Sequence, residues 1–345
     1  MFNNNGCQYA WKYASALLRK LFLSGITALA LYTEFSQAAA IDTVANRPVP
    51  GLQIKPARIA AAAQTAMILA SATAGERLVA VGERGVIMLS DDAGQSFRQA
   101  KSVPISATLT SVHFIDAKNG WVAGHWGAIL KTADAGETWQ LQRSDVKVDQ
   151  PIFSIYFQDG QTGWAVGLWS LILKTTDGGI SWHSVALPLP SGESKADRNL
   201  YSIFPDNQGG LAITAERGAI LRSADKGESW IYTDTAYRGS LWAGKVLRDG
   251  TWLVGGLRGT ILRSTDHGKT WQSSQTGSKS SITGILQEGT GIITAYGLDG
   301  VLLTSKDGGA TFSTTQRKDQ ASITTAIISP GGKLIKFSAS GLLKD

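Results

Sequence analysis

The stretch "KTTDGGISWHS", from Lys174 to Ser184, places a carboxylate before two glycines, and a tryptophan follows three residues after the second glycine. The chain repeats this pattern, Ser/Thr-x-Asp-x-Gly-x-x-Trp/Phe, in "LSDDAGQSFRQ", "KTADAGETWQL", "RSADKGESWIY", "RSTDHGKTWQS" and "TSKDGGATFST". The six aspartates are Asp92, Asp134, Asp177, Asp225, Asp266 and Asp307. A catalytic site needs different groups that converge on one point. In this motif each residue instead has a local role: Asp accepts backbone hydrogen bonds, Gly allows positive φ, and the aromatic ring packs between sheets. The motif is therefore predicted to stabilise a turn.

The spacing of the motif predicts the architecture. Consecutive aspartates lie 41 to 48 residues apart, and each copy follows a second signature of the form "LVAVGERGVIML", in which two variable residues separate two short apolar strands. A seventh copy of that signature, "LIKFSASGLLKD", ends the chain without an aspartate motif. A period of about 40–45 residues with four short strands per unit is typical of a β-propeller. We predict an all-β, seven-bladed propeller over residues 65–345.

The last unit ends after its third strand. Its missing outer strand is expected from the N-terminal segment, residues 41–64, and within it from residues 41–60, because one strand from the other end of the chain would close the ring and cover a free sheet edge. The other interpretation of this segment is a linker.

These motifs carry a family resemblance. The repeated pattern resembles the Asp-box, or BNR repeat, of sialidases, sortilin-type receptors and other propellers. The combination "GWAVG…ILKTTDGGISW" most closely resembles the photosystem II stability/assembly factor family of exported seven-bladed propellers, over about residues 65–345. The resemblance implies a factor that binds a client protein, with arginines on the propeller in contact with that client.

The first 40 residues are typical of a signal peptide. Basic residues precede the apolar run "LFLSGITALALYTEF", and "AAA" at 38–40 supplies a cleavage site between Ala40 and Ile41. The alternative is an uncleaved anchor, but Ser24, Thr27 and Glu34 interrupt the run before the roughly 20 apolar residues that a span needs. We expect a periplasmic or secreted protein with no transmembrane span. Cys7, the only cysteine, would leave with the signal, so no disulfide is expected.

Composition argues against several classes of function. Lys and Arg number 33 against 27 Asp and Glu, a mild and dispersed excess that does not indicate nucleic-acid binding. Four histidines show no ligand spacing, and no glycine-rich phosphate loop precedes a helix. We therefore predict no catalytic residue, no metal and no cofactor, and expect a monomer.

A sialidase-like glycoside hydrolase is the enzymatic alternative. It would need an arginine triad, a Tyr/Glu nucleophile pair and an Asp acid/base. The usual Arg-Ile-Pro signature is absent, since the nearest stretch is "NRPVP", and the tyrosines near acidic residues are not distinctive. An accessory protein of an envelope or transport complex in a non-photosynthetic bacterium is a further alternative.

The face opposite the Asp-boxes is the predicted binding face. In a four-stranded blade the turns between strands two and three lie opposite those between strands three and four. These turns place Arg, Trp and His at their variable positions, residue types enriched at binding hot spots. A solvated turn is the other interpretation, with some arginines paired to Glu83 or Glu216. The long crossing "ALPLPSGESKADRNLYS" lies on the same face. The candidate contacts for a client with acidic and apolar residues are Arg84, Trp126, Trp169, Arg217, Arg258 and Arg198.

Overall fold

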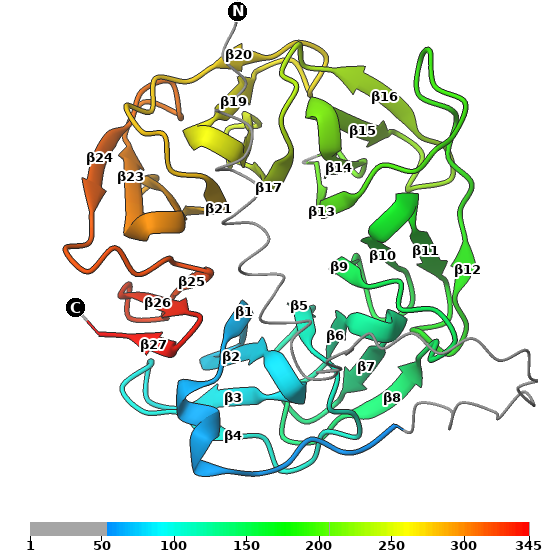
Figure 1. Ribbon diagram of the computed structural model, residues 1–345, viewed down its shortest axis with the longest axis vertical. Coiled ribbons are helices and arrows are strands. Elements are labelled where there is room, and N and C mark those ends of the chain that lie inside the picture. The colour runs from blue at the N-terminus through cyan, green and yellow to red at the C-terminus, as the bar shows by residue number, and fades with distance from the viewer. Residues whose placement is uncertain (1–53, 207, 345) are drawn as a thin grey trace, which may run out of the picture. The chain divides into compact units, whose positions relative to one another are not determined.

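The computed structural model describes residues 54–206 and 208–344, which form seven antiparallel sheets arranged in a ring (Figure 1). Six of these sheets have four strands and the last has three. The prediction of an all-β, seven-bladed propeller is confirmed. In the described part of the chain, no helix has the length and hydropathy needed to span a membrane.

Within each blade the strands follow chain order from the centre of the ring outward. Blade 1 contains β1 (Ile68–Ala74), β2 (Arg77–Gly82), β3 (Ile87–Ser90) and β4 (Arg98–Gln99). Blade 2 contains β5 (Leu109–Phe114), β6 (Gly120–Gly124), β7 (Ile129–Thr132) and β8 (Gln140–Arg143). Blade 3 contains β9 (Ile152–Phe157), β10 (Gly163–Gly167), β11 (Ile172–Thr175) and β12 (His183–Ser184). In each of these blades the Asp-box turn joins the third strand to the outer strand.

The remaining blades repeat this order. Blade 4 contains β13 (Leu200–Pro205), β14 (Leu211–Ala215), β15 (Ala219–Ser223) and β16 (Ile231–Asp234). Blade 5 contains β17 (Leu241–Val246), β18 (Trp252–Gly256), β19 (Ile261–Ser264) and β20 (Gln272–Ser273). Blade 6 contains β21 (Ile282–Gln287), β22 (Ile293–Gly297), β23 (Val301–Ser305) and β24 (Ser313–Gln316). Blade 7 contains β25 (Thr325–Ile328), β26 (Leu334–Ser338) and β27 (Gly341–Leu343).

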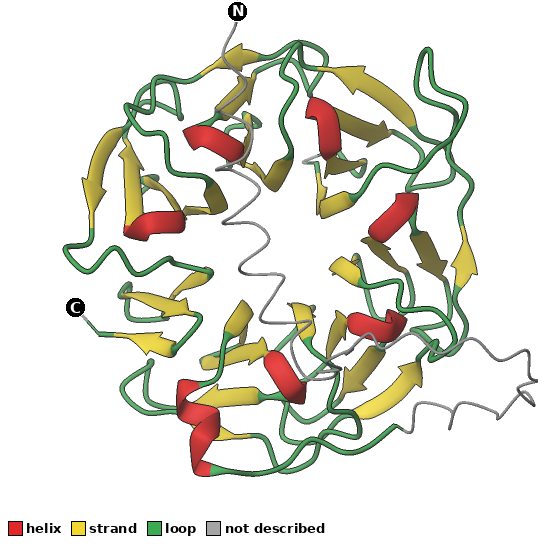
Figure 2. Ribbon diagram, viewed as in Figure 1, coloured by secondary structure: helices red, strands yellow, loops and turns green. Residues whose placement is uncertain are grey.

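Short 3-10 helices are the helical elements of the described residues (Figure 2). One precedes the first blade, η2 (Ala61–Thr65). The others join the second and third strands of blades 1 to 6: η3 (Glu83–Gly85), η4 (His125–Gly127), η5 (Leu168–Ser170), η6 (Glu216–Gly218), η7 (Leu257–Gly259) and η8 (Leu298–Gly300).

The apolar core of the described residues lies between blades. Val79 and Leu89 of blade 1 pack with Val122 and Leu130 of blade 2, and comparable clusters join each successive pair of blades. The Asp-box aromatics lie in these clusters, each between its own blade and the blade before it: Phe97, Trp139, Trp182, Trp230, Trp271 and Phe312. The predicted packing of these rings between sheets is confirmed.

Over residues 54–64, the closure of the ring differs from the predicted closing strand. Residues 54–60 run along the outside of blade 1, where the Ala57 N–H donates to Val103 O at 3.0 Å, and they form no strand beside β27. Instead η2 lies against β27, and a Cβ on Gly341 would come within 2.2 Å of Gln64 O. Residues 41–53 lie outside the described residues, so for them the closing strand stays a prediction.

Apolar packing joins η2 to the first and last blades, which are also linked by the hydrogen bond from Thr324 Oγ1 to Ile68 O. Ala63 and Ala66, in and just after η2, join Ile68 of blade 1 and Ile335 and Phe337 of blade 7 in one buried cluster. This packing supplies part of the cover that an outer strand supplies in the other blades. The N-terminal segment thus does help to close the ring, but as a short helix.

Candidate functional site

The Asp-box turns have the geometry of a structural unit. The Asp177 carboxylate accepts hydrogen bonds from Thr175 Oγ1 at 2.8 Å, from the Ser181 N–H at 2.9 Å and from Ser181 Oγ at 2.6 Å. The Gly179 N–H donates to Thr175 Oγ1 at 2.9 Å. The same contacts, with small changes in distance, recur in the other five boxes. Both carboxylate oxygens are used within the turn.

A hydroxyl that the sequence pattern left as a variable position completes each box. It lies four residues after the aspartate and donates to its second oxygen: Ser96, Thr138, Ser181, Ser229, Thr270 and Thr311. The signal was present in the sequence, because all six copies carry Ser or Thr there.

These hydrogen bonds favour the ionised carboxylates. The Ser96 hydroxyl, the Ser96 N–H and the Ser90 hydroxyl lower the pKa of Asp92 to about 2. Hydrogen bonds from the equivalent Ser or Thr hydroxyl also lower the pKa values of Asp177, Asp225, Asp266 and Asp307. A carboxylate in this state at neutral pH cannot act as a general acid, so the box geometry disfavours a catalytic role.

In the first five pairs of neighbouring blades, a basic side chain of the earlier blade contacts the Asp-box of the following blade. It donates to the carbonyl of the residue after the box aspartate, at 2.9–3.3 Å, from Arg77, Lys131, Lys174, Arg222 and Arg263. The acceptors are Ala135, Gly178, Lys226, His267 and Gly308. These contacts, which we call the basic clamps, link neighbouring blades around the Asp-box face.

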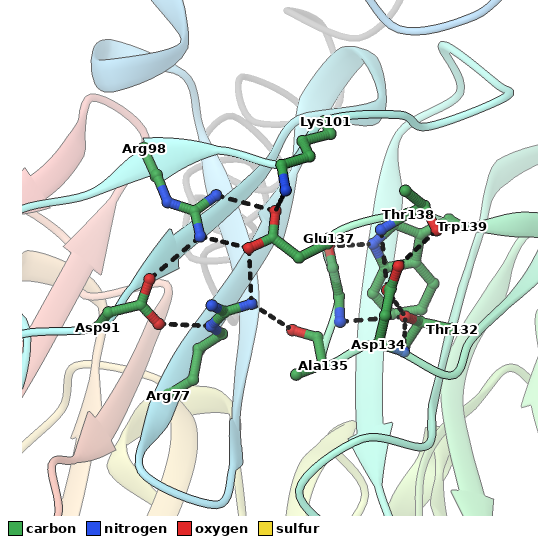
Figure 3. Close-up of polar contacts among 11 residues, drawn as sticks. Arg77, Asp91, Arg98, Lys101, Thr132, Asp134, Ala135, Glu137, Thr138 and Trp139 are labelled. Atoms are coloured by element: carbon green, nitrogen blue, oxygen red, sulfur yellow. Dashed lines mark hydrogen bonds and ion pairs between the residues drawn. The ribbon is translucent and has the colours of Figure 1, made fainter.

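The first clamp belongs to a larger ion-pair cluster (Figure 3). Arg77 contacts Asp91 at 2.5 Å and Glu137 at 3.0 Å, and Arg98 pairs with the same two carboxylates. Lys101 lies 3.6 Å from Glu137. Because the Arg98 guanidinium lowers the pKa of Glu137, the cluster stays ionised. Its charges are satisfied within the chain, which indicates a role in joining blades 1 and 2.

The opposite face carries the turns η3 to η8, and we call it the turn face. The middle residue of each turn has a left-handed backbone with φ of 53–58°: Arg84, Trp126, Trp169, Arg217, Arg258 and Asp299. Five of the predicted contacts therefore occupy equivalent positions around one face. Non-glycine residues adopt this conformation uncommonly. Here it places six side chains of different types at equivalent positions on the turn face.

The arginines of the turn face differ in their pairing. Arg84 and Arg258 are exposed, and their guanidinium groups make no hydrogen bond or ion pair with any described residue. Arg217 contacts Glu193 at 3.0 Å. The suggested pairing with adjacent glutamates is wrong: Glu83 accepts the Met67 N–H and Glu216 accepts from Asn199.

The two tryptophans also differ. The Trp169 side chain is exposed, at 57% of its reference area. The Trp126 side chain is half-buried against the cluster between blades 1 and 2, and the backbone N–H of Trp126 donates to Asp149 at 2.8 Å. Trp169 is therefore the more available aromatic contact.

Arg198 differs from the prediction of an exposed contact. Its side chain is only 13% exposed, lies over the Tyr232 ring at 5.5 Å and contacts Glu193 at 2.6 Å. Arg198 therefore stabilises the crossing between blades 3 and 4 through Glu193 and Tyr232.

One Tyr/Glu pair bears on the sialidase alternative. Tyr201 donates to Glu216 at 3.2 Å. Burial, followed by the Glu216 charge, raises the pKa of Tyr201 to about 12, which disfavours the phenolate that a nucleophile needs. The other Glu216 contacts are to Asn199, so this pair has the features of a structural hydrogen-bond network.

Comparison with known proteins agrees with this geometry. Residues 96–250 match the model of a family described as "Photosynthesis system II assembly factor YCF48", and residues 262–273 match the BNR/Asp-box repeat. Over residues 96–250 the chain is thus similar to this assembly-factor family, and its fold is that of an Asp-box propeller. No curated protein sequence matches the chain significantly.

Solved structures resemble this chain in fold. A structure titled "YCF48 bound to D1 peptide" is 19% identical with a TM-score of 0.66, and the match covers 86% of this chain and 99% of that one. "YCF48 from Cyanidioschyzon merolae" is 14% identical with a TM-score of 0.65, covering 84% and 97%. The WD40 propeller domain of Doa1 has a TM-score of 0.63 at 14% identity, covering 80% and 91%. At these identities the likeness concerns the propeller fold alone.

Proposed function

We propose that this propeller is a non-enzymatic binding or assembly factor that recognises a client protein through its turn face. The observation that carries the proposal is that Arg84 and Arg258 are exposed and have no partner among the described residues, on the same face as the exposed Trp169. Guanidinium groups bind carboxylates through paired hydrogen bonds, and an exposed indole offers apolar contact. A segment with acidic and apolar residues has the matching chemistry.

Two further observations support this proposal. One similar structure is named as bound to a D1 peptide, so a propeller of this fold binds a protein segment. The Asp-box carboxylates are saturated within their turns, which leaves the turn face with the groups most available to a partner. The client of this chain is proposed to be a protein, and a segment of a membrane protein in an envelope or photosynthetic assembly is the candidate.

Export is part of the proposal. Residues 1–40 would direct the chain to the periplasm or outside the cell and would be removed before Ile41. The mature protein is proposed to be a monomer. N-terminal sequencing of the protein recovered from a periplasmic fraction tests this step. A start at Met1 would contradict it.

The test of the binding face compares two charge-reversal variants in a quantitative pull-down from envelope extract. Arg84→Glu/Arg217→Glu/Arg258→Glu changes the turn face, and we expect it to lose partners that the wild type retains. Lys226→Glu/Lys269→Glu/Lys306→Glu reverses three exposed lysines of the Asp-box face and serves as the control. Lys174 does not suit the control, because it contacts Lys226 O and Glu228. Equal losses from both variants, or losses from neither, would contradict the proposal.

A further inference from the structure

Blade 3 departs from its neighbours at the turn η5. In blades 1, 2, 4, 5 and 6 a glycine follows the left-handed residue of the turn, whereas blade 3 has Ser170. Trp169 and Ser170 therefore have positive φ in succession, at 53° and 57°. Backbone strain of this kind persists only where surrounding contacts hold it, and it is concentrated at functional sites.

The long crossing between blades 3 and 4 holds this strained turn. We call this crossing, residues 185–199, the strap. The Arg198 carbonyl accepts the Ser170 N–H at 2.8 Å and the Ser170 hydroxyl at 3.1 Å. Asn199 Oδ1 accepts the Trp169 N–H at 3.1 Å, so the strap bonds both left-handed residues.

The same strap residues reach the turn η6 of blade 4. Asn199 Nδ2 donates to Glu216 Oε1 at 2.8 Å, and Glu216 directly precedes Arg217. Asn199 thus bonds to the turn that presents Trp169 and to the turn that presents Arg217. The exposed side chains of Trp169 and Arg217 therefore belong to turns that are joined by hydrogen bonds to Asn199.

Glu193 of the strap already occupies Arg217. Its Oε1 contacts Arg198 Nη2 at 2.6 Å and Arg217 Nη1 at 3.0 Å. The Arg198 side chain is 13% exposed and the Arg217 side chain 60% exposed. The hydrogen bond from Arg198 lowers the pKa of Glu193, so this carboxylate is ionised at neutral pH. Arg217 accordingly holds a carboxylate of its own chain through one of its nitrogens.

We propose that the strap builds a recognition subsite in which Trp169 contacts an apolar side chain of the client and Arg217 receives an adjacent client carboxylate that displaces Glu193. The inference rests on the proposed function, since it assumes that the turn face binds a protein segment. The Glu193 carboxylate stays paired after it is displaced from Arg217, because it keeps its contact with Arg198. The free Arg217 fork can then form two parallel hydrogen bonds to the incoming carboxylate. Glu193 thus competes with the client carboxylate for Arg217 and lowers the affinity of the subsite for the client.

The probes for this subsite are four fluorescein-labelled synthetic octapeptides, built on Leu-Asp, Leu-Asn, Ser-Asp and Leu-Lys repeats, measured by fluorescence anisotropy. We expect the Leu-Asp peptide to bind most tightly. Glu193→Gln should tighten that binding about fivefold, because one competing charge-assisted contact is weakened. Trp169→Ala should weaken it about tenfold or more, as loss of an aromatic anchor does. Arg217→Gln should reduce the Leu-Asp affinity to that of the Leu-Asn peptide.

Glu228→Gln is the matched control, because Glu228 pairs with Lys174 on the Asp-box face. It should leave the affinity of the Leu-Asp peptide unchanged. The melting temperature of each variant is measured beside the binding, so that loosening of the strap is seen directly. A folded Glu193→Gln protein that binds the Leu-Asp peptide no more tightly than wild type would overturn the subsite, as would an unchanged affinity in Trp169→Ala. No Leu-Asp binding to wild type or to Glu193→Gln would overturn it too.

The two proposals fail differently. If the Leu-Asp peptide depends on Arg84 and Arg258 but not on Trp169, Arg217 or Glu193, the subsite is wrong and the binding face stands. If charge reversal on the turn face changes neither peptide binding nor the pull-down, both are wrong.

Discussion

On the Asp-box face, each box carboxylate is saturated by its own turn, and basic clamps link successive blades. On the turn face, Arg84 and Arg258 have no partner among the described residues, and Arg217 is held by a single carboxylate. Both faces carry carboxylates, basic side chains and tryptophans in repeated turns. The difference shows that repetition alone does not identify function: groups satisfied within the chain stabilise it, and groups left unsatisfied are available to a partner.

The largest expected effect separates two tryptophans. Trp139 of the second Asp-box is buried at 4% exposure, and Trp139→Ala should lower the free energy of unfolding by about 3–5 kcal/mol through the cavity it leaves. Trp169→Ala, on the turn face, should change it by less than about 0.5 kcal/mol. Denaturant unfolding of both variants measures the difference. Similar losses would break the distinction between the two faces.

A smaller loss is expected from one box carboxylate. Asp134 accepts hydrogen bonds from Thr132 Oγ1, the Thr138 N–H and Thr138 Oγ1 (Figure 3). Asp134→Ala leaves these donors to water and should cost about 1–2 kcal/mol of unfolding free energy. The exposed Asp197 of the strap is the control, and Asp197→Ala should be close to neutral. A stable Asp134→Ala protein that had lost client binding would contradict the structural role of the box.

The basic clamps should contribute less. Lys131 donates to Gly178 O at 3.3 Å and lies over the Trp121 ring at 5.0 Å. Lys131→Met keeps the aliphatic contact and removes the charge, so we expect a loss of about 0.5–1 kcal/mol. Because the clamp contacts the third box, its effect should be non-additive with that of Asp177→Ala. Additive changes in melting temperature would show that clamp and box act independently.

The smallest effect concerns acid stability. The pKa of Asp92 falls from 3.8 to about 2 on folding, so its stabilising contribution is complete above pH 3.8 and is lost as the pH falls through about 2. The difference in melting temperature between wild type and Asp92→Asn should therefore be constant near neutral pH and shrink below pH 3.8. Thermal unfolding at a series of pH values measures it. A difference that grows on acidification would mean that the carboxylate is not stabilised by its turn.

Much of the fold could be predicted because its determinants are local. The Asp-box and the turn signature each lie within a dozen residues, so their repetition in the sequence predicts blade number, strand order and the two faces. The Ser or Thr four residues after each aspartate was equally local and could have been found from the six copies.

The parts that differ depend on contacts between distant residues. The burial of Arg198 follows from Tyr232, which lies on the outer strand of the next blade. The pairing of Arg217 with Glu193 joins a turn to a crossing whose path the sequence does not show. The cover of β27 was predicted as a strand because the repeat lacks one there, but the preceding residues form η2, which also buries Ala63. Free and paired arginines look alike in a sequence.

The contact between η2 and blade 7 has a mechanical consequence. Within every blade, force along the chain is shared by a ladder of backbone hydrogen bonds, whereas the described contact of η2 with β27 relies on apolar side chains. Tension applied at residue 54 would first break the Ala57–Val103 hydrogen bond and would then detach η2 from β27 before it shears any strand. Within the junction of blades 7 and 1, the contact of η2 with β27 is therefore the part that a single-molecule stretching experiment should open before the strands separate.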